Sequence, residues 1–320
     1  MAKKLHLVLG IGGLGLLVWM IYRTGFSILK ANLLHFGLWS SLFLIALYAL
    51  AQISFGAAWY VVLEEADKSV GFWRIFLAYA AGDALNMTVP SGNLAGEPVK
   101  IMLIKDKVSV EAAITSVTVY KFADFLSLTL FLLAGWIFHF AFYTLPLPWE
   151  VGAGVIAFGM TVTAAILFWV QKKGMYLPLG NWLRKLGLEK WIGDKLVSAR
   201  LVDEGVRRFY ARHPRKFYLS VFFNFLAWFG GVLEIVIFLS FMGLPASFPA
   251  GLTVETFSLF LNNVTFFVPA RIGIGEGGRT LLFISLGFAK EVGLTYAIIR
   301  RIRELAWVGL GLLVLSSHRK

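Results

Sequence analysis

The stretch PSGNLAGEPVK, residues 90–100, recurs 179 positions later as PARIGIGEGGR, residues 269–279, with no gap. Each copy follows an apolar segment and precedes a second segment that is too short to cross a bilayer. The copies share a leading proline, a central glycine, a glutamate and a base: Pro90 and Pro269, Gly96 and Gly275, Glu97 and Glu276, Lys100 and Arg279. A broken apolar segment that carries an acid and a base, and occurs twice, predicts a transport-type site built from an internal repeat.

The composition indicates a membrane protein. Of the 320 residues, 58% are hydrophobic, and the mean hydropathy is +0.76. Several apolar runs reach the roughly 18–20 residues that cross a hydrocarbon layer of about 30 Å, whereas the alternating segments of a barrel are absent. We therefore predict an all-α polytopic membrane protein that forms a single integral membrane domain over residues 1–320. The net charge of +12 fits basic cytoplasmic loops better than nucleic-acid binding.

Hydropathy and charge together predict the topology. The basic linker 171–216 and the basic termini are placed in the cytoplasm. The basic loops and both termini fall on the cytoplasmic side only if each repeated motif enters and leaves the membrane by the same face, as a re-entrant hairpin. Residues 5–140 and 148–315 then form an inverted-topology repeat. The alternative is that both motif segments cross fully. About six spanning helices are expected, at 5–22, 36–63, 111–140, 148–170, 217–243 and 292–315, with broken arms at 73–90 and 253–268.

Residues 178–213 within the linker have an amphipathic pattern. Apolar side chains such as Trp182, Leu196 and Phe209 are expected to face lipid, while Arg200 and Arg207 face anionic headgroups. The alternative is a plain solvated linker.

Ionisable residues at membrane depth are rare and usually functional. Lys121 and Asp124 in one span correspond to Arg301 and Glu304 in the other half. The predicted substrate-binding residues are Glu97, Lys100, Lys121, Asp124, Arg271, Glu276, Arg279, Arg301 and Glu304. The predicted hairpin breaks contain Pro90, Gly92, Asn93, Gly96, Pro269, Gly273 and Gly275. Asp83, Asn86, Thr88, Asn262, Asn263 and Thr265 are expected to complete a polar cavity.

Two other interpretations of these charges remain. Glu97–Lys100 and Glu276–Arg279 can be internal ion pairs that hold the hairpins, because residues three apart share a helical face. The two glutamates are also candidate proton carriers, since burial favours the neutral carboxyl. The sequence does not favour a metal site or a bound nucleotide cofactor. The chain has no cysteine and only five scattered histidines, so no metal site or cofactor is predicted. The G-x-G-x-x-G pattern at 273–278 lacks a βαβ unit around it.

At these motifs the chain resembles the flippase-like family, the membrane region of lysylphosphatidylglycerol synthases. The residues that carry the resemblance are Pro90, Gly96-Glu97-Pro98, Lys100, the Lys121–Asp124 segment, and Pro269 with Gly273-Ile274-Gly275-Glu276. The resemblance implies movement of a lipid between leaflets, here without the soluble synthase domain.

The expected function is therefore a lipid flippase of the bacterial inner membrane, with both termini cytoplasmic, and not an enzyme. Its substrate is expected to be an anionic or polar-headed lipid, phosphatidylglycerol-like, with a hopanoid or polyprenyl lipid as alternatives. The linker is expected to bind anionic headgroups. Two kinds of assembly are compatible with the sequence: a homo-oligomer and a complex with a lipid synthase. The alternative functions are an integral membrane enzyme acting on a lipid phosphate or polyprenyl carrier, and a non-transporting subunit of a lipid synthase.

Overall fold

The computed structural model describes residues 18–22, 26–63, 70–89, 91, 93–178, 182 and 195–317, and over these residues the chain forms helices and turns without a strand. The predicted span 5–22 lies outside this part of the chain, except for its last five residues, which are helical. The longer elements, in chain order, are α2 (Phe26–Val62), α3 (Phe72–Thr88), α4 (Glu97–Ile104), α5 (Val110–His139), α6 (Leu147–Lys173), α9 (Lys195–Arg212), α10 (Pro214–Phe241), α11 (Phe248–Val264), η2 (Pro269–Arg271), α12 (Ile274–Ser285) and α13 (Lys290–Ser317).

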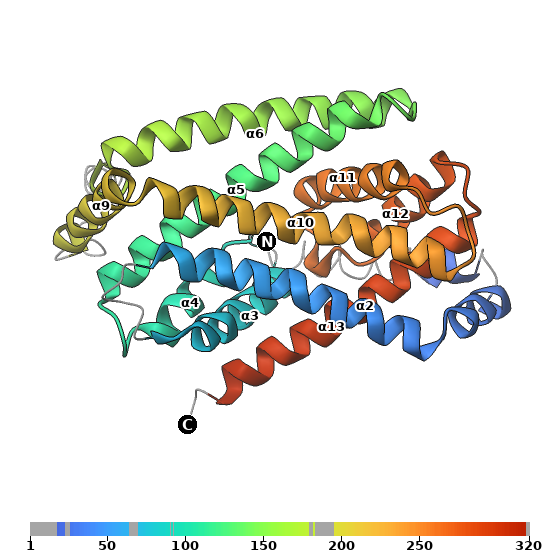
Figure 1. Cartoon of the computed structure of the whole chain (residues 1–320), viewed down its shortest axis with the longest axis horizontal. Coiled ribbons are helices and arrows are strands. Elements are labelled where there is room, and N and C mark those ends of the chain that lie inside the picture. The colour runs from blue at the N-terminus through green and yellow to red at the C-terminus, as the bar shows by residue number, and fades with distance from the viewer. Residues whose placement is uncertain are drawn as a thin grey trace.

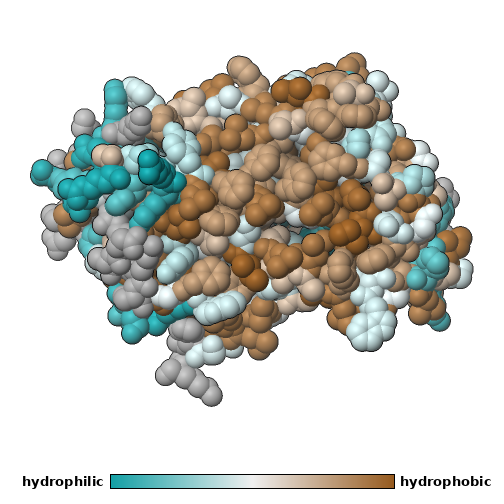
Figure 2. Space-filling view, in the orientation of Figure 1, coloured by the Kyte–Doolittle hydropathy of each residue, from teal (hydrophilic) through white to brown (hydrophobic). Residues whose placement is uncertain are grey.

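Four of the described helices are long and apolar enough to cross a membrane: α2, α5, α10 and most of α6. α13 has the same 28-residue length as α10, but the charged residues at 300–304 interrupt its apolar character. Figure 2 shows hydrophobic side chains over the middle of one face and hydrophilic ones gathered at the end where α9 lies. The prediction of an all-α polytopic membrane protein is confirmed.

The elements α3–α4 and α11–α12 are helical hairpins, as the repeated motif predicts. Each long arm has 17 residues, and the short arms have 8 and 12. At 1.5 Å per residue the short arms extend only about 12 and 18 Å, too little to cross a layer of about 30 Å. The hairpins enter from opposite ends of the molecule, and their tips point toward each other near its centre (Figure 1). There, Arg271 Nη2 donates a hydrogen bond to Asn93 Oδ1 at 3.4 Å.

The two halves of the chain exchange their hairpins. α3 of the first half packs on α13 of the second, α11 of the second packs on α5 of the first, and α2 packs along α10. The α3–α13 contact is close because position 311 is a glycine: a Cβ at Gly311 would lie 2.4 Å from the carbonyl oxygen of Ala80. This reciprocal packing is what an inverted repeat requires, and it brings both charged breaks to the centre of the molecule.

The linker before α10 contains α9, which packs against α5 and α6. Asp203 anchors it, because its carboxylate accepts hydrogen bonds of 2.8, 3.0 and 2.8 Å from the backbone amides of residues 175–177. Phe209 is only 1% exposed, so the expectation that it faces lipid is wrong: the anchored helix turns this ring toward the protein. Arg200 is exposed, as predicted. Residues 179–181 and 183–194, and the side chain of Leu196, lie outside the part of the chain that the structure describes.

Candidate functional site

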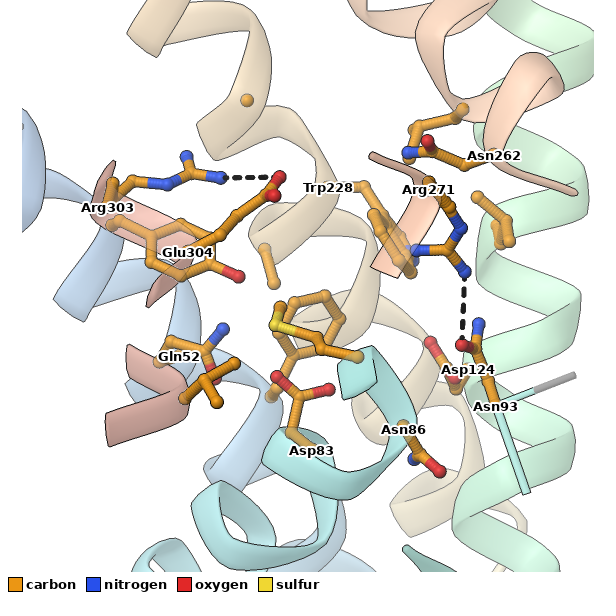
Figure 3. A pocket seen from close by; sticks show the side chains of 18 of the residues that line it. Gln52, Asp83, Asn86, Asn93, Asp124, Trp228, Asn262, Arg271, Arg303 and Glu304 are labelled. Carbon is orange, nitrogen blue, oxygen red and sulfur yellow. Dashed lines mark hydrogen bonds and ion pairs between the residues drawn. The ribbon is translucent and has the colours of Figure 1, made fainter. Parts of the chain in front are cut away.

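A cavity of about 190 Å³ lies where the hairpin tips meet (Figure 3). The residues that line it come from both hairpins, including α4, η2 and α12, and from α2, α5, α10 and α13. Its lining is densely charged. The basic residues that line it are Lys100, Lys121, Arg271, Arg279, Arg300, Arg301 and Arg303, and the acidic residues are Asp83, Asp124, Glu255 and Glu304. Seven of the nine predicted substrate-binding residues therefore line one cavity. The other two, Glu97 and Glu276, hold the bases of that lining in place.

In the first half, Glu97 on α4 connects the short arm to the next helix. Its Oε1 atom lies 3.2 Å from Lys100 Nζ and 3.7 Å from Lys121 Nζ, and it accepts a hydrogen bond of 3.3 Å from Asn86 Nδ2. Lys121 Nζ also lies 3.2 Å from Asp124 Oδ2. Lys100 is 1% exposed, so the network replaces the water that this ammonium group loses on burial.

In the second half, Glu276 on α12 makes the equivalent connection. Its Oε1 atom accepts a hydrogen bond of 2.6 Å from Arg301 Nε, and its Oε2 atom accepts one of 2.7 Å from the amide of Gly273. Arg301 Nη1 lies 3.0 Å from Glu304 Oε2 and donates to the carbonyl oxygen of Ala270 at 2.9 Å. A glutamate on the short arm, a base on the following helix and an acid three residues later thus occur in both halves.

Arg279 departs from this symmetry. The sequence places it on the same helical face as Glu276, but Glu276 pairs with Arg301 of α13 instead. Arg279 has a long ion pair with Glu304, at 3.7 Å, and its Nε and Nη1 atoms have no hydrogen-bond partner among the described residues. The side chain is only 3% exposed. A buried guanidinium group with free donors therefore faces the cavity.

Two further ion pairs were not predicted from the sequence. Arg300 makes a two-bond contact with Glu255 of α11, and Arg303 pairs with Glu234 of α10. The guanidinium carbon of Arg303 also lies 3.7 Å from the centre of the Tyr48 ring, a favourable cation–π contact. The available signal was a single carboxylate in each of two otherwise apolar helices, which is unusual at membrane depth.

The break residues shape the hairpin tips. Asn93, Ala270 and Arg271 have positive φ angles of 62°, 49° and 54°, which L-residues seldom adopt. The amide of Gly96 donates to Asn86 Oδ1 at 2.7 Å, so the short arm is fixed to the long one. Pro90 and Gly92 lie outside the described residues. Pro269 lies in η2, Gly273 precedes α12, and Gly275 leaves room for Arg279, whose Nη1 atom would lie 3.3 Å from a Cβ there.

Possible ligands are limited by the side chains present. Lys100 Nζ lies 5.0 Å from the centres of the Tyr79 and Tyr120 rings, so its free side is covered by aromatic groups. Within the described ranges, no group of three or more His, Asp or Glu side chains is placed to hold a metal ion. The free donors of Arg279 are suited to an anion. So is Arg271 Nε, for which the described ranges also supply no hydrogen-bond acceptor.

These features define an integral membrane protein with a charged internal cavity between two opposed broken-helix hairpins, an arrangement typical of transport proteins. The chain belongs to the family of the lysylphosphatidylglycerol synthase TM region, whose model matches residues 5–312. The resemblance inferred from the motifs is thereby confirmed, and it supports a role related to membrane lipids. The chain is also similar to the UPF0104 membrane protein of Pyrococcus horikoshii, with 21% identity over 337 aligned positions that cover 100% of this chain and 98% of the relative. No solved structure matches the chain.

Proposed function

We propose that this protein moves a lipid with an anionic or polar headgroup, such as phosphatidylglycerol, between the two leaflets of a membrane. The observation that carries the proposal is Arg279, a buried cavity arginine with two nitrogen atoms that receive no hydrogen-bond acceptor from the described part of the chain. A buried donor without an acceptor costs about 1–3 kcal/mol, and more when it is charged. A phosphate oxygen at this position would remove that cost, and arginine binds phosphate in a two-bond geometry.

Arg271 is the second candidate contact for the phosphate. It lies at the tip of its hairpin and lines the cavity, and no described residue accepts a hydrogen bond from its Nε atom. Its Nη2 contact with Asn93 joins the two hairpin tips across the centre of the molecule (Figure 3). Separation of the tips on one side and then on the other would open the cavity to each leaflet in turn. The ion pairs of Glu97 and Glu276 would hold the bases in position during this movement.

The proposal assigns transport without chemical conversion of the lipid. The headgroup would pass through the cavity, while the acyl chains stay in the surrounding bilayer. It includes the orientation with both termini in the cytoplasm, because the basic linker and termini then lie on the side that attracts positive charge. The membrane concerned would be the bacterial inner membrane.

Reconstituted vesicles provide the test. Phosphatidylglycerol with a fluorophore on one acyl chain is added to both leaflets, and a membrane-impermeant reductant then reports how fast inner-leaflet lipid reaches the outside. We expect wild-type protein to accelerate this exchange and Arg279→Ala to slow it at least about tenfold, since one charged hydrogen bond contributes about 1.5–3 kcal/mol. Arg200→Ala is the matched control, because Arg200 lies on α9 with 70% exposure.

Two results would count against the proposal. Folded wild-type protein that exchanges no lipid would refute it. A new lipid species in the vesicles, detected by mass spectrometry, would instead support the membrane-enzyme alternative.

A further inference from the structure

The two halves of the cavity differ at one charged position. Asp83 lies on α3, and Asn262 lies 179 residues later on α11, which is the offset of the repeated motif. Both residues line the cavity. Figure 3 shows the carboxylate of Asp83 directed into it. The first half therefore offers the cavity a negative charge where the second half offers a neutral amide.

Asp83 differs from the other carboxylates of the cavity because it has no ion pair among the described residues. The other three are paired: Asp124 with Lys121, Glu255 with Arg300, and Glu304 with Arg301. A carboxylate that is partly removed from water and has no partner is unfavourable, because the low-dielectric surroundings penalise an isolated charge. Among the described residues, Asp83 thus has no counter-charge within ion-pair distance.

The nearby lysines are already engaged by other groups. Lys100 pairs with Glu97 and lies between two tyrosine rings. Lys121 lies within ion-pair distance of both Glu97 and Asp124. Neither ammonium group lies within ion-pair distance of Asp83, so this carboxylate is available to a cationic group that enters with a ligand.

The total charge of the site also favours a ligand that carries a cationic group. Seven bases line the cavity, against four acids in the lining and three acids that pair with those bases: Glu97, Glu234 and Glu276. With all groups ionised, the site is neutral before a ligand enters. A phosphate group alone would add one uncompensated negative charge in a region of low dielectric constant. A positive charge that enters with the phosphate would remove this cost.

We infer that the cavity binds a phosphate-bearing headgroup together with one monovalent cationic group, and that Asp83 is the ligand of that cationic group. The inference deepens the proposed function and rests on it for the identity of the anion. Gln52, which also lines the cavity and is 2% exposed, offers an amide oxygen that can accept a hydrogen bond from an ammonium group or ligate a sodium ion. Two sources carry the required charge: an ammonium group on the same headgroup, or a free sodium ion that accompanies an anionic headgroup.

Binding measured apart from transport tests this inference. Short-chain phosphatidylethanolamine and phosphatidylglycerol are titrated against detergent-purified protein, and the rise in the thermal unfolding midpoint gives their affinities in sodium buffer and in N-methylglucamine buffer. The variants are wild type, Asp83→Asn and Glu204→Gln. Asparagine is the residue that the repeat carries at the equivalent position. Glu204 on α9, 38% exposed, is the matched acid-to-amide control.

A headgroup ammonium predicts that wild type binds phosphatidylethanolamine roughly tenfold more tightly than phosphatidylglycerol without sodium, the effect of one charged hydrogen bond. A free cation predicts that sodium strengthens phosphatidylglycerol binding roughly tenfold. Either difference is expected to vanish in Asp83→Asn and to persist in Glu204→Gln. The inference is overturned if wild type shows neither difference, or if the difference survives in Asp83→Asn. Wild-type protein that shows the difference but exchanges no lipid in vesicles would refute the transport proposal and leave the cation site standing.

Discussion

Replacing Glu276 with alanine removes two buried hydrogen bonds in one step. The carboxylate, fully buried with its residue 0% exposed, accepts from Arg301 Nε at 2.6 Å and from the amide of Gly273 at 2.7 Å. A hydrogen bond to a charged group contributes about 1.5–3 kcal/mol, and a helix N-terminal cap about 0.5–2 kcal/mol. We therefore expect Glu276→Ala to lower the free energy of unfolding by about 2–5 kcal/mol.

Glu276→Gln separates the two contributions. Its amide oxygen can still accept from Gly273, but it carries no charge for Arg301, so we expect a loss of only about 1.5–3 kcal/mol. In both variants Arg301 retains its ion pair with Glu304, at 3.0 Å, which limits the loss of stability. Thermal unfolding in detergent, followed by size-exclusion fluorescence, ranks the variants. Equal midpoints for Glu276→Ala and Glu276→Gln would refute the cap, and a wild-type midpoint in both would refute the whole argument.

Two further predictions concern packing and buried charge. Gly96→Ala would place a Cβ 2.0 Å from the carbonyl oxygen of Gly82, so it should destabilise the first hairpin by about 3 kcal/mol or more. Gly152→Ala is the control, because no atom of the described residues lies within 4 Å of the new Cβ. It should keep the wild-type unfolding midpoint. Glu234→Gln should cost about 3–5 kcal/mol by leaving Arg303 buried without its partner, and Glu234→Leu combined with Arg303→Met should recover most of that loss. A double variant as unstable as the single one would contradict this account.

Most of the architecture could be predicted because the bilayer allows few solutions. Apolar runs of about 20 residues have to be helices, and a charged, glycine-rich break has to be buried in protein. Each predicted span within the described residues corresponds to a helix, although α2 begins at Phe26 instead of residue 36. Lys30, Asn32 and His35 interrupt the apolar run before residue 36, which explains the later predicted start, and Gly37, with a φ of 78°, breaks the helix close to that point.

The pairing of charges across elements could not be predicted, since helical spacing reports only neighbours on one helix. Spacing suggested a Glu276–Arg279 pair, but α12 packs against α13, and Glu276 pairs with Arg301 of α13 instead. Spacing predicted Glu97–Lys100 correctly because both residues lie on α4. Two further pairs join different helices: Glu234 with Arg303, 69 positions apart, and Glu255 with Arg300, 45 positions apart. Substrate binding by the nine predicted residues remains a prediction.

The exchange of hairpins between the halves also sets the order in which the protein can be completed during synthesis. The first hairpin ends at Ile104, but the helix that covers it, α13, begins at Lys290, so residues 105–289, 185 in all, must be translated in between. At about 5–20 residues per second this takes roughly 10–40 s. During that time α3, which carries Asp83, has no α13 beside it. The nascent chain therefore depends on its surroundings, translocon or lipid, to hold an unfinished charged hairpin until its final helix arrives.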